Sequence, residues 1–112
     1  MIDAAPAALA QRQLNAYNQR DLEAFLEPYS DDVEIYEFPN QLQLKGKAAM
    51  RESYRTMFEQ SPQLHCELVN RMVLDNTVID QERVTGLRGK TMQAIAIYTI
   101  QDGKIARVTF VP

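Results

Sequence analysis

Apolar residues in the first half of the chain recur three, four and seven positions apart, as they do along the buried face of a helix. This pattern predicts three helices: one that begins at Pro6, a short one between Asp21 and Pro28, and one from about Lys47 to Gln60. Pro6 suits the first helical turn, because the missing N–H has no helical partner there. Asp21 is a helix-capping residue, and Pro28 cannot continue the helix that precedes it.

The rest of the chain alternates apolar and polar residues, as half-buried strands do. Strands are predicted over Val33–Phe38, Leu64–Leu74, Thr77–Leu87, Thr91–Ile100 and Lys104–Val111. Turns are predicted at the pairs Asp75-Asn76, Arg88-Gly89 and Asp102-Gly103, and at the cluster Ser30-Asp31-Asp32. Helices followed by a meander of strands indicate an α+β fold, with the helices packed on one side of an antiparallel sheet.

The composition indicates one ordered domain over residues 1–112. With 46% hydrophobic residues and a net charge of -3, the chain is neither disordered nor basic enough to bind nucleic acid. The longest apolar run, Ala94–Tyr98, is too short to span a membrane, and Met1–Pro6 has no signal-peptide pattern. We therefore expect a soluble, cytoplasmic protein. Cys66 is the single cysteine, and no Cys/His cluster points to a metal site, so no metal is expected. No organic cofactor is expected either.

Four segments carry a resemblance to a known family: Ala16–Phe25, Tyr29–Glu34, Gly46–Arg51 and Asp102–Ile105. Together they resemble the NTF2-like superfamily, and more narrowly its SnoaL-like proteins and ketosteroid isomerases. The resemblance runs from about Ala8 to Phe110. It is specific for the fold, whereas members include isomerases, cyclases, dehydratases, epoxide hydrolases and proteins with no assigned reaction.

The resemblance implies a cone-shaped NTF2-like fold, in which three N-terminal helices pack on a strongly curved, mostly antiparallel sheet. It also implies a ligand pocket at the open end of the cone and a homodimer formed through the sheet. Apolar residues facing away from the cone would supply a self-complementary interface. Ile95 and Ile97 are expected there, with Val108 or Phe110.

Glu37 is the first candidate for catalysis, because it aligns with the carboxylate base of the ketosteroid isomerases. An apolar mouth formed with Phe38 and Pro39 would raise the pKa of this carboxylate into the range useful for proton transfer. The alternative is a solvated glutamate at a strand end. The phenolic donor of the isomerases falls near Gln13 or Leu14 and their second carboxylic acid near Ala96. None of these residues supplies the required group, so authentic ketosteroid isomerisation is not expected.

Asp80 and Glu82 are the second candidates, and the strand register decides where they point. A two-residue turn before this strand pairs Arg71 with Asp80 and Val69 with Glu82, on the same polar, solvated face as His65. A turn longer by one residue places both carboxylates inside the cone, because a slip of one residue inverts every side chain. Alignment with the isomerases favours the inward placement, and the pattern alone leaves both open.

Several core residues are also candidates for the pocket wall, since the core of a cone becomes its pocket near the open end. These are Tyr17, Tyr54, Phe58 and Tyr98. His65 is added because it is the only side chain with an ordinary pKa near neutrality, although a structural histidine is the alternative.

These observations predict a cofactor-independent isomerase, cyclase or hydrolase that acts on a small apolar oxygenated molecule. Glu37, or Asp80 with Glu82, would serve as general base. The alternative is a non-catalytic module of the same fold that binds a small ligand or only dimerises.

Overall fold

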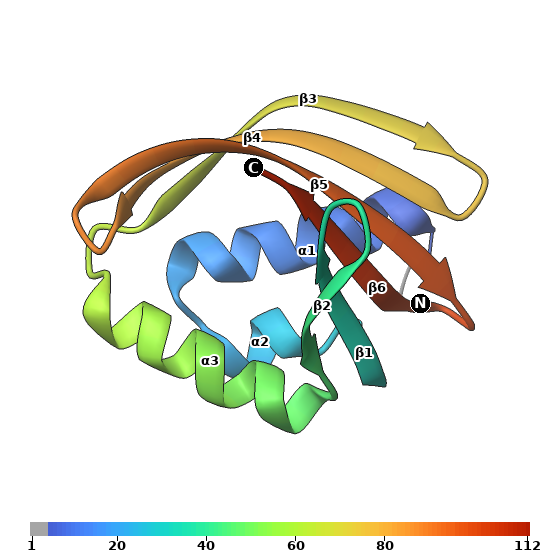
Figure 1. Cartoon of the computed structure of the whole chain (residues 1–112), viewed down its shortest axis with the longest axis horizontal. Helices are drawn as coiled ribbons and strands as arrows, with labels where there is room; N and C mark the ends of the chain where they lie inside the picture. The colour runs from blue at the N-terminus through green and yellow to red at the C-terminus, as the bar shows by residue number, and fades with distance from the viewer. Residues whose placement is uncertain (1–4) are drawn as a thin grey trace.

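The computed structural model describes residues 5–112 as a strongly curved, open sheet that wraps around three helices (Figure 1). The helices are α1 (Pro6–Gln19), α2 (Leu22–Leu26) and α3 (Lys47–Gln60). The strands are β1 (Tyr29–Glu37), β2 (Gln41–Lys45), β3 (His65–Leu74), β4 (Thr77–Leu87), β5 (Lys90–Gln101) and β6 (Lys104–Val111). Met1–Ala4, part of the segment read as lacking a signal peptide, lie outside the described residues. No helix among the described residues has the length and apolar composition needed to cross a membrane.

The six strands follow the order β2-β1-β6-β5-β4-β3. Only β1 and β6 are parallel, while all other neighbours in the sheet are antiparallel. All three helices lie on the concave side of the sheet, with α1 across the middle and α3 along the open margin (Figure 1). The predicted α+β architecture of helices on a curved, mostly antiparallel sheet is confirmed.

The local signals for the helices are borne out in detail. Pro6 begins α1, the Asp21 carboxylate accepts a hydrogen bond from the Ala24 N–H at 3.2 Å, and α3 has the predicted bounds. The two-residue turn at Asp75-Asn76 is also confirmed, because Leu74 pairs directly with Thr77. Each of these features depends on residues close together in the sequence.

One prediction about β1 is wrong, and its neighbour β2 was missed. Ser30-Asp31-Asp32 is not a turn but part of β1, since Tyr29 pairs with Ile105 of the distant β6 and extends the strand. The short strand β2 was not predicted at all, and it forms by pairing with β1 from Glu34↔Lys45 to Glu37↔Gln41. Long-range pairing overrides local turn and strand preferences in both places.

The core lies between the concave face and the helices, and an aromatic cluster centred on Phe25 occupies its middle. The Phe25 ring lies 4.7 Å from Tyr54, 5.3 Å from Tyr29 and 5.8 Å from Tyr17, measured between centroids. Each of these four rings comes from a different element, so the cluster joins α1, α2, α3 and β1.

The outward-facing residues proposed for a dimer interface need one correction. Val108 is 1% exposed and belongs to the core, and Phe110 lines the cavity inside the cone. Val108 pairs with the core residue Tyr98, so the alternation of β6 directs it inward. Ile95 is 37% exposed and alternates with the buried Ala96. The homodimer stays a prediction, now without Val108 and Phe110.

Asn18 connects α1 to the edge strand β3. Its side-chain amide donates to the Cys66 carbonyl at 3.0 Å, and its carbonyl accepts from the Cys66 N–H at 2.7 Å. Asn18 thus satisfies both backbone groups of one strand residue, as a neighbouring strand would.

We expect Asn18→Ala to lower the free energy of unfolding by about 1–3 kcal/mol, because it leaves the two backbone groups of Cys66 without these partners. Urea denaturation followed by circular dichroism measures the change. Asn15→Ala is the matched control, because Asn15 is exposed and its side chain hydrogen-bonds only to the Gln11 side chain among the described residues. Equal stability of the two variants would contradict this assignment.

Candidate functional site

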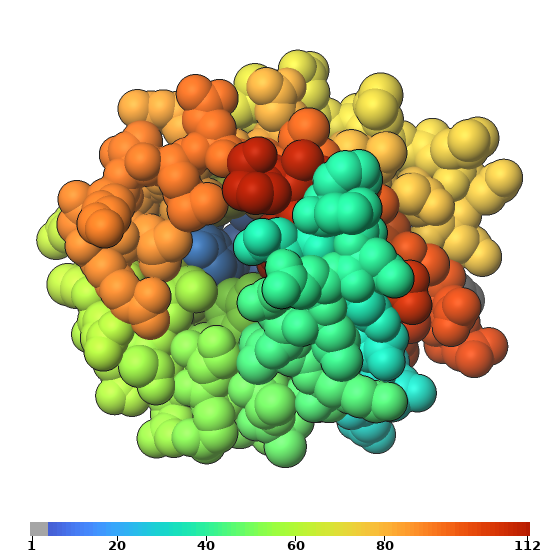
Figure 2. Space-filling view, viewed as in Figure 1, coloured from blue at the N-terminus to red at the C-terminus, as the bar shows by residue number. Residues whose placement is uncertain are grey.

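A cavity of about 180 Å³ lies between the concave face of the sheet and the helices. Figure 2 shows the hollow between the β4–β5 turn, the β1–β2 hairpin and α3, with part of α1 visible inside it. Its inner wall is aromatic, formed by Tyr17, Phe25, Tyr29, Tyr54 and Tyr98, and Leu87, Met92 and Phe110 also line it. The fold therefore contains a cavity, and its use as the expected ligand pocket stays a prediction.

Among the described residues that line this cavity, Glu82 on β4 is the only carboxylate. Glu82 is 6% exposed. Burial raises the pKa of its carboxyl group from 4.5 to about 7, and repulsion from Asp80 is the second cause of this rise. Hydrogen bonding with Cys66 and Tyr98 and the charge of Arg71 act in the opposite direction on this pKa. Near neutral pH, Glu82 can therefore both accept and release a proton.

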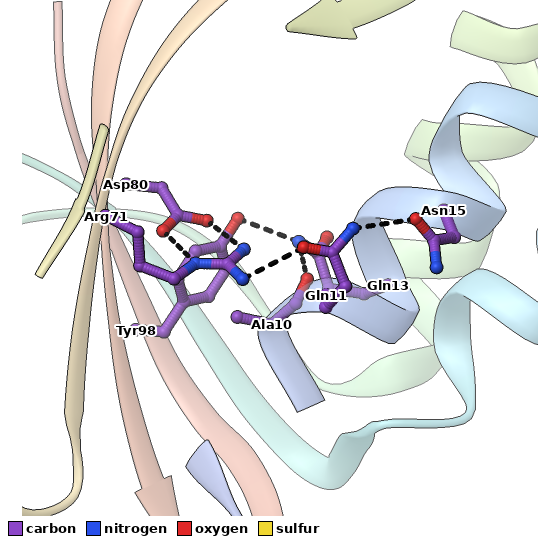
Figure 3. Close-up of polar contacts among 7 residues, drawn as sticks. All are labelled: Ala10, Gln11, Gln13, Asn15, Arg71, Asp80 and Tyr98. Carbon is purple, nitrogen blue, oxygen red and sulfur yellow. Dashed lines mark hydrogen bonds and ion pairs between the residues drawn. The ribbon is translucent and has the colours of Figure 1, made fainter. Parts of the chain in front are cut away.

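Asp80 lies two residues before Glu82 on the same face of β4 and is fully buried. Arg71 of β3 holds this carboxylate in a bidentate pair, with Nε–Oδ1 at 2.7 Å and the second N–O contact at 2.9 Å. The same guanidinium donates to Gln11 of α1 at 3.0 Å, and Gln11 donates to Asn15 at 2.8 Å (Figure 3). Asp80 is therefore a paired charge behind the cavity wall rather than a group that lines the cavity.

A β-bulge in β3 settles the register question that the sequence left open. Arg71 pairs with Asp80 as the two-residue turn predicts, but Leu68, not Val69, pairs with Glu82. The extra residue, Val69, shifts the alternation of β3 by one position. Arg71 consequently lies on the inner face, and Asp80 and Glu82 point into the cone although the turn is short. Of the two placements that the sequence left open, the solvated one is wrong and the inward one is confirmed.

Gln13 of α1 is a buried polar residue that fixes the tyrosines next to Glu82. Its side-chain amide donates to the Tyr98 oxygen at 3.0 Å and to the Ala10 carbonyl at 2.9 Å, and its carbonyl accepts from the Tyr29 hydroxyl at 2.9 Å. Since the Tyr98 oxygen accepts from Gln13, the Tyr98 proton is free to point elsewhere, and hydrogen bonding between Tyr98 and Glu82 contributes to the pKa of Glu82. Gln13 was not predicted as a site residue, although a glutamine beside the apolar face of a helix was a usable signal.

The cavity wall includes four of the predicted site residues: Glu82, Tyr17, Tyr54 and Tyr98. Phe58 is buried in the aromatic cluster, 5.7 Å from the Phe25 ring, but it does not line the cavity.

Glu37 and His65 lie outside the cavity, which corrects two expectations about their surroundings. Glu37 is exposed at the end of β1 beside Phe38, which is 55% exposed, so no apolar mouth encloses its carboxylate. His65 begins β3 one residue before the buried Cys66, and alternation directs its exposed side chain away from the core. Within residues 5–112, no three His, Cys, Asp or Glu side chains lie together as metal ligands would.

The family model described as a SnoaL-like domain matches residues 10–108, and the chain belongs to this family. No curated protein matches the chain in sequence. The predicted resemblance to NTF2-like and SnoaL-like proteins is therefore confirmed.

Solved structures confirm the fold at low sequence identity. An uncharacterised cystatin-fold protein from Novosphingobium aromaticivorans is similar with a TM-score of 0.87 and 22% identity, covering 93% of this chain and 95% of that chain. An NTF2-like protein of unknown function from Cytophaga hutchinsonii has a TM-score of 0.81 and 15% identity, with coverages of 98% and 89%. A protein provisionally described as a polyketide cyclase from Sinorhizobium meliloti has a TM-score of 0.78 and 18% identity, with coverages of 91% and 92%.

The raised pKa of Glu82 makes the stability of the protein depend on pH. Between pH 4.5 and about 7 the folded state holds a proton that the same glutamate loses in the unfolded chain, so stability falls as the pH rises through this window. We expect Glu82→Gln to remove this dependence and to raise the free energy of unfolding above neutrality by about 2 kcal/mol. Urea titrations at several pH values provide the measurement, with the exposed Glu67→Gln as control. A Glu82→Gln variant less stable than the native chain at alkaline pH would refute the account.

Asp80 is expected to raise the pKa of Glu82 by charge repulsion, whereas Arg71 lowers it. In Asp80→Asn the repulsion disappears and the Arg71 charge remains, so the pKa of Glu82 should fall. Carbon NMR of the labelled glutamate carboxyl group against pH measures the shift directly. Glu67→Gln is the control and should leave the midpoint of the Glu82 titration unchanged. An unchanged midpoint in Asp80→Asn would contradict the proposed coupling between Asp80 and Glu82.

Proposed function

We propose that the protein catalyses proton transfer on a small, apolar, oxygen-containing molecule held in the cavity, with Glu82 as general base and general acid. The observation that carries this proposal is the Glu82 carboxylate on the wall of an otherwise largely apolar cavity. Burial there keeps the pKa of Glu82 at about 7, where a carboxylate can remove a proton and its conjugate acid can return it. Isomerisation and cyclisation of carbonyl compounds both need such a step.

Tyr98 supports this chemistry as a hydrogen-bond donor whose proton turns from the Glu82 carboxylate to the substrate oxygen as the negative charge moves from the carboxylate to that oxygen. Its oxygen is occupied by the Gln13 N–H, and the Tyr29 hydroxyl bonds to the other end of the same amide. This chain holds the Tyr98 hydroxyl in place before substrate binds, and a preorganised donor is what a developing enolate oxygen requires. Burial raises the pKa of Tyr98 well above its ordinary value, so the hydroxyl keeps its proton at neutral pH.

The size of the cavity limits the substrate. An apolar protein cavity of about 150 Å³ holds one benzene molecule. The cavity here has about 180 Å³, which corresponds to one ring with a small substituent rather than to a four-ring steroid. We therefore propose monocyclic ketones as the first compounds to examine.

Non-catalytic binding of a small molecule is the second candidate function. It is supported by the cavity wall, which apart from Gln13 and Glu82 is aromatic, aliphatic or sulfur-containing. A module that only dimerises would have its cone filled by its own side chains, which does not agree with the cavity.

We expect the protein to exchange the α-hydrogens of cyclohexanone or a substituted cyclohexanone for deuterium in deuterated water. The loss of their proton NMR signal measures the rate of exchange. Glu82→Gln should slow exchange by about a hundredfold or more, because the base is lost. Tyr98→Phe should slow it by about tenfold to a hundredfold, because one donor to the enolate oxygen is lost.

Glu37→Gln is the matched control, because Glu37 is exposed and outside the cavity. Exchange that persists in Glu82→Gln, or that falls equally in Glu37→Gln, would disprove the assignment of the base. Binding of the ketones without any exchange would instead support the non-catalytic module.

A further inference from the structure

Glu82 differs from the other buried carboxylate of the described structure in having no cationic partner. Asp80 is fully buried but paired twice with the Arg71 guanidinium. No ion pair of the described residues includes Glu82, and no Lys, Arg or His lines the cavity. Once Glu82 is ionised, the cavity therefore carries one uncompensated negative charge, and a buried charge is stable only when it is paired.

Aromatic rings surround the same space from five different elements. Tyr17 comes from α1, Phe25 from α2, Tyr29 from β1, Tyr54 from α3 and Tyr98 from β5, and all five line the cavity. The face of an aromatic ring attracts cations electrostatically, and this attraction grows when the cation is removed from water. An aromatic enclosure with one unpaired carboxylate is complementary to an organic ammonium ion.

We propose that the cavity binds a small monocyclic organic ammonium ion, with the ammonium group against the Glu82 carboxylate and the ring against the aromatic wall. The volume of about 180 Å³ sets the size, since it accommodates one ring and a short side chain. Neutral molecules of the same shape lose the ion pair, and anions meet the repulsion of Glu82. This selectivity does not depend on proton transfer, so it extends beyond the proposed function.

Glu82 is the group that changes the charge of the cavity near neutral pH, because the groups around it keep their charge there. Burial raises the pKa of the tyrosines Tyr17, Tyr29, Tyr54 and Tyr98 and of the Cys66 thiol, so all of these stay neutral. Asp80 and Arg71 form a neutral pair on the β3–β4 side. The preference for an ammonium ion therefore appears as the pH rises through the pKa of Glu82.

Benzylammonium and benzyl alcohol test this proposal, because they have the same shape and differ in charge. We expect the full chain to bind benzylammonium about tenfold more tightly than benzyl alcohol at a pH of about 8.5, measured by NMR titration. At a pH of about 5.5 the glutamic acid is neutral and the preference should disappear. Benzoate should bind more weakly than either compound at the higher pH.

Two variants separate the role of Glu82 from general charge effects. Glu82→Gln should abolish the preference for benzylammonium while benzyl alcohol still binds, and the exposed Glu67→Gln should behave as the native chain does. Equal binding of the two compounds at the higher pH, a preference that survives in Glu82→Gln, or no binding of either compound would overturn the proposal. The native chain compared at two pH values keeps the test decisive even if Glu82→Gln folds poorly. If the native chain binds benzylammonium selectively but exchanges no ketone hydrogens, the proposed proton transfer is disproved and ammonium binding stands. The two proposals therefore fail separately.

Discussion

The bidentate pair between Arg71 and Asp80 is the interaction on which the cavity depends. Asp80 is fully buried, and an unpaired carboxylate at that depth would cost several kcal/mol, on the order of the whole stability of a small domain. Arg71 makes the burial possible, and Gln11 links the pair to α1. β4 can therefore carry two carboxylates toward the helices instead of directing them to solvent.

The same pair gives the two carboxylates different properties. Asp80 has a cationic partner and lies behind the wall, whereas Glu82 has none and lines the cavity. Burial and the neighbouring Asp80 raise the pKa of Glu82 to about 7. Glutamate at this position lowers the stability of the folded chain at alkaline pH relative to an uncharged residue, and proteins keep such unfavourable groups mainly where function requires them.

The sequence allowed the fold to be predicted well and the site only in part. Local signals such as Pro6, the Asp21 cap and the Asp75-Asn76 turn determine their elements because each acts within a few residues. The family resemblance led to Glu37 by alignment, but exposure depends on what surrounds a strand end, and Glu37 lies in solvent. Gln13 was missed because two of its partners, Tyr29 and Tyr98, reach it only in the folded chain.

By itself, the sequence determined the order of the helices and of every strand except β2, the antiparallel meander and the tight turn that pairs Arg71 with Asp80. Only the tertiary structure decided which face of the sheet that pair occupies. Side chains alternate along a strand with a period of two, so the single extra residue at Val69 inverts the inner and outer faces of β3 beyond it. A bulge arises from pairing between strands, which is not encoded in the local pattern of hydrophobic and polar residues.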